Sequence, residues 1–177
     1  MKYTTYMTFN KRKFRIIVFS WVLFATCASA FGQTQASKSE LKDFGKFYLL
    51  ADTTKYITKA NLPKKGQILM MLYDPYCDFC DTFLKKLHKE MDKYKDLQVY
   101  LISLSQQKEV EEFQKKHSKD IASRKNVHFL RDKDYGFLLT FDPDMFPSIL
   151  LFDAAKERLL ARSDGIDEME SVFKALR

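Results

Sequence analysis

The sequence predicts an α/β domain in which a central mixed β-sheet has helices on both faces. Two observations predict it. Continuous apolar runs, typical of strands covered on both faces, alternate with amphipathic segments of helical period. Near the C-terminus, two strand-like segments separated by a short polar link predict an antiparallel hairpin. A parallel β-α-β start that is followed by a hairpin requires a mixed sheet.

The elements are expected in the following order along the chain. A helix is expected over Glu40–Leu50, because apolar residues recur there every three or four positions, and a turn over Asn61–Gly66. The next segments are a strand Ile68–Tyr73, a helix after the cysteines, a strand Val99–Leu104, a helix capped by Ser105 and ending at His117, a strand Val127–Leu130, a short helix Asp134–Phe141, a hairpin of Ser148–Phe152 and Glu157–Ala161, and a helix from about Asp167.

The positive charge of the chain belongs to its N-terminus. The 177 residues carry a formal net charge of +7, and residues 1–30 contain no acidic residue. Five bases lie in that stretch: Lys2, Lys11, Arg12, Lys13 and Arg15. The remainder is close to neutral and has no basic patch interleaved with aromatic residues, so we expect no nucleic-acid partner.

Residues 1–30 have the pattern of a signal peptide. A basic region ends at Arg15, an apolar stretch runs over Ile16–Ala25, and Ala28-Ser29-Ala30 offers a small-residue cleavage site. We therefore divide the chain into a signal peptide (1–30), an N-terminal extension with a helix (31–60) and the α/β domain (61–177). The apolar stretch is too short for a stable membrane span, which predicts a periplasmic or otherwise exported protein. An uncleaved N-terminal anchor and lipidation at Cys27 remain alternatives.

After cleavage near Ala30, the chain has two cysteines, Cys77 and Cys80, separated by two residues. A bridge between them closes a very small loop, so it is expected to serve as a redox pair and not as a structural staple. The helix start supplies unpaired N–H groups and a partial positive charge, which stabilise a thiolate. An apolar stripe places Cys80 on the buried side of this helix and Cys77 at its exposed tip. The stripe consists of Cys80, Leu84, Leu87, Met91 and Tyr94.

Two motifs resemble the thioredoxin-like superfamily, particularly its exported members related to the TlpA/ResA group. They are Asp74-Pro75-Tyr76-Cys77-Asp78-Phe79-Cys80 and Met145-Phe146-Pro147-Ser148-Ile149-Leu150-Leu151-Phe152-Asp153. The resemblance implies a thioredoxin-like fold and thiol–disulfide exchange, with Cys77 as the attacking thiol and Cys80 as the resolving thiol. It also implies that Pro147 is a cis-proline beside the cysteines. Phe146 and Pro147 would shape the substrate groove, with Tyr76 as an aromatic wall.

The sequence departs from the family in the surroundings of the cysteines. Tyr76 stands where many thioredoxins have tryptophan, and Met71 stands where thioredoxin has a buried acid. The proton acceptor that serves the resolving cysteine in the family is therefore missing at that position, and Asp74 is a candidate proton relay. Asp74, Asp78 and Asp81 add negative charge near the pair, which opposes thiolate formation. We therefore expect that the pair is not a strong oxidant and that its potential is nearer to that of thioredoxin-type reductants.

The leading functional prediction is an exported oxidoreductase that reduces or exchanges disulfides in protein substrates. It requires a thiol electron-donor protein and no cofactor, because the chain has no nucleotide-binding motif. One alternative is a non-catalytic thioredoxin-like binding module. Another is a metal site in which His88, His117 or His128 joins the cysteines. We expect no metal, because the histidines lack the spacing of a metal-binding motif.

Overall fold

The computed structural model describes residue 41 and residues 44–177. The predicted signal peptide, its cleavage site at Ala30 and Cys27 lie outside the described residues. The chain divides into two compact units, residues 1–37 and 38–177, and all described residues belong to the second. Among the described residues, no helix has the length and apolar character needed to cross a membrane.

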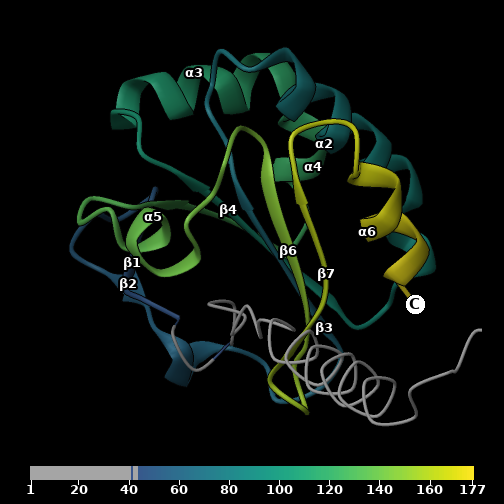
Figure 1. The fold of residues 1–177 in the computed structure, drawn as a ribbon. Helices are drawn as coiled ribbons and strands as arrows, with labels where there is room; N and C mark the ends of the chain where they lie inside the picture. Colours follow the sequence, from purple (N-terminus) through teal and green to yellow (C-terminus); the bar gives the residue numbers. More distant parts are fainter. Residues whose placement is uncertain (1–40, 42–43) are drawn as a thin grey trace, which may run out of the picture. The chain divides into compact units, whose positions relative to one another are not determined.

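A seven-stranded mixed sheet forms the centre of the second unit, with the strand order β2-β1-β5-β4-β3-β6-β7 (Figure 1). Neighbours β3, β4 and β5 pair in parallel, and the remaining pairs are antiparallel. The strands are β1 (Phe47–Leu49), β2 (Tyr56–Ile57), β3 (Gln67–Leu72), β4 (Leu97–Ser103), β5 (Val127–Arg131), β6 (Ser148–Asp153) and β7 (Arg158–Asp164). The predicted parallel start and C-terminal hairpin are thus confirmed.

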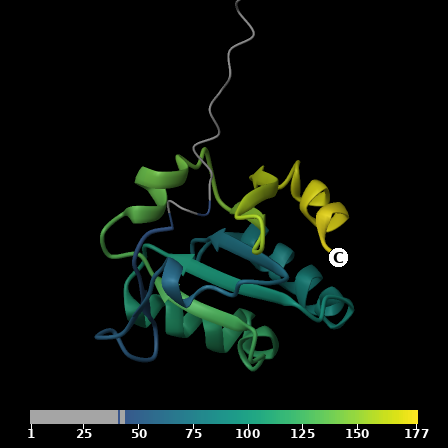
Figure 2. The same ribbon diagram turned by 90° about the horizontal axis from the view of Figure 1, so that it is seen from below.

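Helices cover both faces of the sheet, as predicted, and they divide the core into two clusters. The helices are α2 (Asp78–Glu90), α3 (Gln107–His117), α4 (Lys119–Ala122), α5 (Gly136–Phe141) and α6 (Met169–Ala175), with 3-10 turns at Lys59–Asn61 and Met91–Lys93. Apolar residues of α2, α3, α4 and α6 pack on one face, together with Leu69 and Met71 of β3. Helix α5 packs with Leu41 and Phe44 against the other face, where Met70 and Leu72 point. Helices α5 and α6 lie apart in both views (Figures 1 and 2).

The helix expected over Glu40–Leu50 is wrong from residue 44 onward, because residues 44–46 form no helix and Phe47–Leu49 form strand β1. Tyr48 pairs with Tyr56 of β2 on one side and with Arg131 of β5 on the other. The first pairing is a local hairpin, whereas the second comes from a distant part of the chain, and together they outweigh the three-to-four spacing. The first two strands belong to the same sheet as the rest, so the domain begins before the expected boundary at residue 61.

The expected cap of the third helix is also wrong by one residue. Gln106 is the N-cap of α3, and its backbone N–H donates to the Glu109 carboxylate at 2.9 Å. Ser105 instead stays in the strand-to-helix link, where its N–H donates to the Ser103 hydroxyl oxygen at 3.2 Å. Its carbonyl oxygen accepts from Arg131 Nε at 2.9 Å. These two contacts hold Ser105 just before the helix.

The pairing of β3 with β6 brings the two sequence motifs to one end of the sheet. Leu72, the last residue of β3, lies opposite Ser148, the first residue of β6. The link to Cys77 and the segment ending at Pro147 therefore lie at the same edge. At the other end, Gln67 holds the C-terminus: its Nε2 donates to the Ala175 carbonyl at 2.9 Å, and its Oε1 accepts from the Arg177 N–H at 2.8 Å.

Candidate active site

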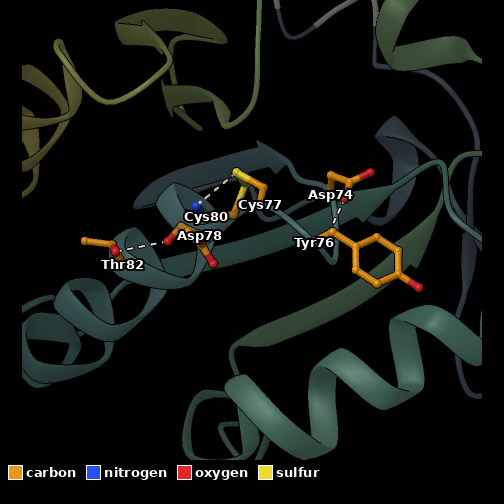
Figure 3. Close-up of a disulfide and its surroundings, with 6 residues drawn as sticks. All are labelled: Asp74, Tyr76, Cys77, Asp78, Cys80 and Thr82. Carbon is orange, nitrogen blue, oxygen red and sulfur yellow. Dashed lines mark hydrogen bonds between the residues drawn. A yellow bond between two sulfur atoms is a disulfide. The ribbon is translucent and has the colours of Figure 1, made fainter.

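Cys77 and Cys80 form a disulfide at the start of α2 (Figure 3). Cys77 is the N-cap of the helix, and its sulfur accepts the backbone N–H of Cys80 at 3.2 Å. The side chain of Cys77 is half-buried, whereas Cys80 is fully buried beside Phe83 and Leu84. The apolar stripe of α2 thus places one sulfur where another molecule can reach it and the other in the core, as the sequence predicted.

The link before Cys77 is a tight turn that the Asp74 side chain holds. Asp74 Oδ1 accepts the backbone N–H of Tyr76 at 2.8 Å, and the Asp74 carbonyl accepts the N–H of Cys77 at 3.1 Å. The Tyr76 ring extends away from the sulfurs and is 76% exposed (Figure 3). The negative charges of Glu109 and Glu112 on α3, together with slight burial, raise the pKa of the Tyr76 phenol.

Pro147 lies buried before β6, and the Phe146–Pro147 peptide bond is cis. The Pro147 carbonyl accepts the N–H of Gly165 at 2.8 Å, which ties this segment to the end of β7. Gly165 has a φ of +85°, and a side chain at this position would collide with Met145. Phe146 remains 36% exposed beside the buried proline. The structure therefore presents an exposed aromatic ring on a segment held by the two last strands.

Beneath the cysteines, the end of β3 is apolar except for one hydroxyl group. Met71 is fully buried in the same cluster as Cys80, so a thioether and not a carboxylate occupies the position six residues before Cys77. Tyr73 is also fully buried, with its ring 5.2 Å from that of Phe113. Burial, and to a smaller extent the charge of Asp74, raises the Tyr73 pKa far above its ordinary value. This hydroxyl has no hydrogen-bond partner among the described residues.

Asp81 makes two contacts that were not predicted. Its Oδ2 pairs with Lys85 Nζ at 2.6 Å and lies 3.6 Å from Nδ1 of His117, the last residue of α3. The spacing of four residues between Asp81 and Lys85 was a usable signal for the first contact. Nothing local indicated the second, because it depends on how α3 packs against α2.

The three histidines do not gather around the cysteines. His88 Nδ1 accepts from Arg124 Nε at 3.2 Å, His117 lies beside Asp81, and His128 Nε2 lies 3.2 Å from Gln98 Oε1. Within residue 41 and residues 44–177, no group of three or more histidine, cysteine and acidic side chains could hold a metal ion.

The chain was compared with protein-family models, curated protein sequences and solved structures. No family model and no curated protein sequence matches the chain. Solved structures do match: a secreted disulfide oxidoreductase of Mycobacterium tuberculosis has a TM-score of 0.60 at 13% identity, over 77% of this chain and 97% of that one. A thiol-disulfide oxidoreductase of Bacteroides fragilis has a TM-score of 0.57 at 19% identity, over 75% and 97%. A thioredoxin-like protein of Aeropyrum pernix has a TM-score of 0.60 at 13% identity, over 76% and 91%. The chain therefore has the thioredoxin-like fold, with its CxxC pair at the start of a helix that follows a central strand.

Proposed function

We propose that this chain is an exported thiol–disulfide oxidoreductase that reduces or exchanges disulfides in protein substrates. The observation that carries the proposal is the Cys77–Cys80 disulfide, in which a half-buried sulfur caps α2 and a fully buried sulfur lies one turn further on. The solved structures described as disulfide oxidoreductases support a redox role in general.

The geometry supports different roles for the two sulfurs: Cys77 attacks the substrate, and Cys80 resolves the mixed disulfide. In the reduced protein, Cys77 attacks as the thiolate, because the N–H of Cys80 and the positive end of α2 stabilise negative charge on its sulfur. The attack on a substrate disulfide forms a mixed disulfide and releases the first substrate thiolate. Cys80 then attacks Cys77, which restores the observed disulfide and releases the second.

The exposed residues around Cys77 supply a surface for the substrate. Tyr76, which follows β3, and Phe146, which precedes β6, offer exposed apolar area near the paired ends of these strands, and Pro147 shapes the segment that enters β6. An extended substrate segment would pair with the backbone before Pro147 by strand addition. Asp74, in the turn just before Cys77, remains a candidate proton relay.

Turnover requires a partner that returns electrons to the disulfide, and we assign this role to a thiol electron-donor protein.

For export, we propose cleavage of residues 1–30 near Ala30. N-terminal sequencing of the exported protein tests this: the expected first residue is Phe31, whereas a lipid-modified first residue at Cys27 or an intact N-terminus would establish an alternative.

Insulin reduction with dithiothreitol as electron source tests the enzymatic proposal. The protein is expected to accelerate the reaction, and Cys77→Ser is expected to abolish the acceleration. Cys80→Ser is expected to accumulate a mixed disulfide at Cys77, which mass spectrometry detects. If the parent protein shows no cysteine-dependent turnover, the chain is a non-catalytic binding module instead.

A further inference from the structure

The α5–β6 link (residues 142–147), which carries Phe146 and Pro147 to the edge of the sheet near Cys77, has no regular secondary structure (Figure 1). Its exposed side chains are Asp142, Asp144, Met145 and Phe146. An irregular, exposed segment of this kind keeps its place through the contacts that other elements make with it. Those contacts therefore determine where Phe146 and the backbone before Pro147 lie.

Arg162 of β7 holds the first end of the α5–β6 link. Its Nη1 donates to the Phe141 carbonyl at 2.8 Å, and its Nη2 donates to the Asp142 carbonyl at 2.8 Å. These carbonyls belong to the C-terminal end of α5, where a helix leaves its acceptors without a partner of its own. Asp142 has a φ of +47°, so the chain bends out of the helix at the point that the guanidinium holds.

The guanidinium of Arg162 is fixed in turn by a carboxylate on the same strand. Its Nε donates to Asp164 Oδ2 at 2.7 Å, and its Nη2 lies 2.7 Å from the same oxygen. The Asp164 side chain is only 12% exposed, so water screens this pair weakly. A planar guanidinium can contact one carboxylate and two carbonyls together, whereas a lysine ammonium is a point charge on a flexible stem. The arrangement therefore requires arginine and not merely a positive charge.

Gly165, the residue after β7, holds the other end of the α5–β6 link. Its N–H donates to the Pro147 carbonyl at 2.8 Å. The Met145 side chain occupies the space that a side chain at Gly165 would need. The next residue of the chain, Ser148, pairs with Asp164 in the sheet. Residues 162–165 thus hold the link at both of its ends.

The position of Cys77 is set by other contacts. The turn that Asp74 holds and the start of α2 place its sulfur. A small disulfide needs only access to this sulfur. A protein segment that pairs with the backbone before Pro147 also needs the α5–β6 link in a fixed place. Small and protein disulfides are therefore expected to depend differently on Arg162.

We propose that Arg162 is a positioning residue that favours protein disulfides over small ones, because it holds the α5–β6 link ready for a protein segment; the inference rests on the proposed function. Arg162 acts through the link and leaves the chemistry at Cys77 unchanged. A link that is already in place adds no ordering cost when the substrate binds, whereas a mobile link must be ordered first. Loss of the guanidinium contacts is therefore expected to raise KM for a protein substrate.

Arg162→Lys tests this inference with two disulfides of different size. Insulin reduction with dithiothreitol as electron source reports on the protein substrate. Release of coloured thiolate from 5,5′-dithiobis(2-nitrobenzoate) by the reduced protein reports on the small one. In Arg162→Lys, kcat/KM for insulin is expected to fall at least about fivefold, mainly through KM, while the rate constant with the small disulfide stays within about twofold. Hydrogen exchange, followed by mass spectrometry, is expected to become faster in residues 142–147 and to stay unchanged at the start of α2.

The matched control is Arg158→Lys, which makes the same replacement at the exposed first residue of β7 and is expected to change neither rate. Equal insulin kinetics of the parent and Arg162→Lys would overturn the inference. An equal loss with both disulfides would also overturn it, because it would show damage to the fold or to Cys77.

If Arg162→Lys does not fold, Gly165→Ala takes its place, because the added methyl group displaces Met145 at the other end of the link. The same two comparisons then decide. If the parent protein reduces insulin no faster than Cys77→Ser does, the proposed function fails, and the inference fails with it.

Discussion

The charge next to a reactive sulfur sets its tendency to ionise, and at this site two influences oppose each other. The start of α2 and the Cys80 N–H favour a thiolate at Cys77, whereas Asp74 and Asp78 disfavour it. The pairing of Asp81 with Lys85 compensates part of the third negative charge. The balance is expected to give a thiolate that is less stabilised than in strong disulfide oxidants.

We therefore expect a reduction potential nearer to the thioredoxin value of about −270 mV than to the value of about −120 mV of a strong oxidant. Equilibration of the Cys77–Cys80 couple with glutathione measures it. Replacing the exposed negative charge by a positive one, in Asp78→Lys, is expected to make the disulfide more oxidising. A Cys77 pKa below about 5, measured by thiolate absorbance, would contradict this expectation.

His128 is expected to make the free energy of unfolding depend on pH. Its ring stacks on Tyr100 at 4.9 Å, and partial burial lowers its pKa below the ordinary value of 6.5. The unfolded chain therefore binds more protons than the folded one, so stability is expected to fall as the pH drops below about 6.5. His128→Phe, which keeps an aromatic ring, is expected to remove this part of the decline. Because the ring is only part-buried, the effect is below about 1 kcal/mol.

Urea unfolding at pH 5 and pH 8 measures this effect as the change in the free energy of unfolding. The comparison between parent and variant isolates His128 from the other two histidines. An equal loss of stability in both proteins at the lower pH would show that His128 does not contribute.

Local sequence was sufficient for some site residues and insufficient for others. Cys77 and Cys80 could be predicted because their spacing and the apolar stripe of α2 are local properties of one segment. The approach of His117 to Asp81 could not be predicted, because the two side chains belong to different helices. Such a contact depends on tertiary packing, which a local pattern does not determine.

Among the elements, α5 depends on a single buried carboxylate. Asp132, which is 3% exposed, accepts the N–H of Gly136 at 2.9 Å through Oδ1 and the N–H of Phe137 at 2.8 Å through Oδ2. These contacts satisfy two donors that the helix start would otherwise leave unpaired. They also hold the helix whose end leads into the segment that contains Pro147.

Asp132→Ala is expected to lower the free energy of unfolding by about 2 kcal/mol, because two N–H groups lose their acceptor. Urea denaturation monitored by circular dichroism measures the change. Asp134→Ala is the matched control: this carboxylate is exposed, and its contact with the Tyr48 hydroxyl is 3.4 Å long. A similar loss in both variants would mean that the capping contacts of Asp132 contribute little.

The predictability of each element follows from its length and its burial. The buried runs that became β3 and β6 could be predicted, because burial on both faces leaves a continuous apolar sequence. The half-buried β7 could be predicted because a short polar link separates it from β6, as in a hairpin. Strands β1 and β2 have three and two residues. Segments of two or three residues are too short to show a period-two pattern. Strand β1 forms by pairing with β5, and β2 by pairing with β1.

At the scale of the whole domain, charge is separated along the strand direction. The C-terminal ends of β3, β4, β5 and β7 and the start of β6 meet at the edge that carries Cys77. The exposed acids in the loops and helix starts at this edge include Asp78, Asp134, Asp142, Asp144, Asp167 and Glu168, with Lys46, Lys108 and Lys133 among them. The exposed bases at the opposite edge include Lys64, Lys65, Lys95, Lys125, Lys156 and Arg177, with Asp92, Asp96 and Glu157 among them.

This separation is expected to accelerate encounters with positively charged substrates. At low ionic strength, a disulfide peptide flanked by lysines should be reduced at least about tenfold faster, in kcat/KM, than the same peptide flanked by glutamates. The ratio should approach one in about 1 M salt, where the Debye length is only about 3 Å. Asp144→Lys is expected to reduce the ratio, and Lys64→Glu, at the far edge, to preserve it. Equal rates at low salt would contradict this expectation.

The anchoring of the C-terminus by Gln67 has a practical consequence. Gln67 begins the strand whose other end leads to Cys77, so Arg177 and the redox pair lie at opposite ends of β3. A tether attached after Arg177 would hold the domain on a sensor chip or resin with its cysteines directed toward the solution. The Cys80→Ser variant, immobilised in this orientation, would serve as bait that retains its substrates covalently until a reductant elutes them.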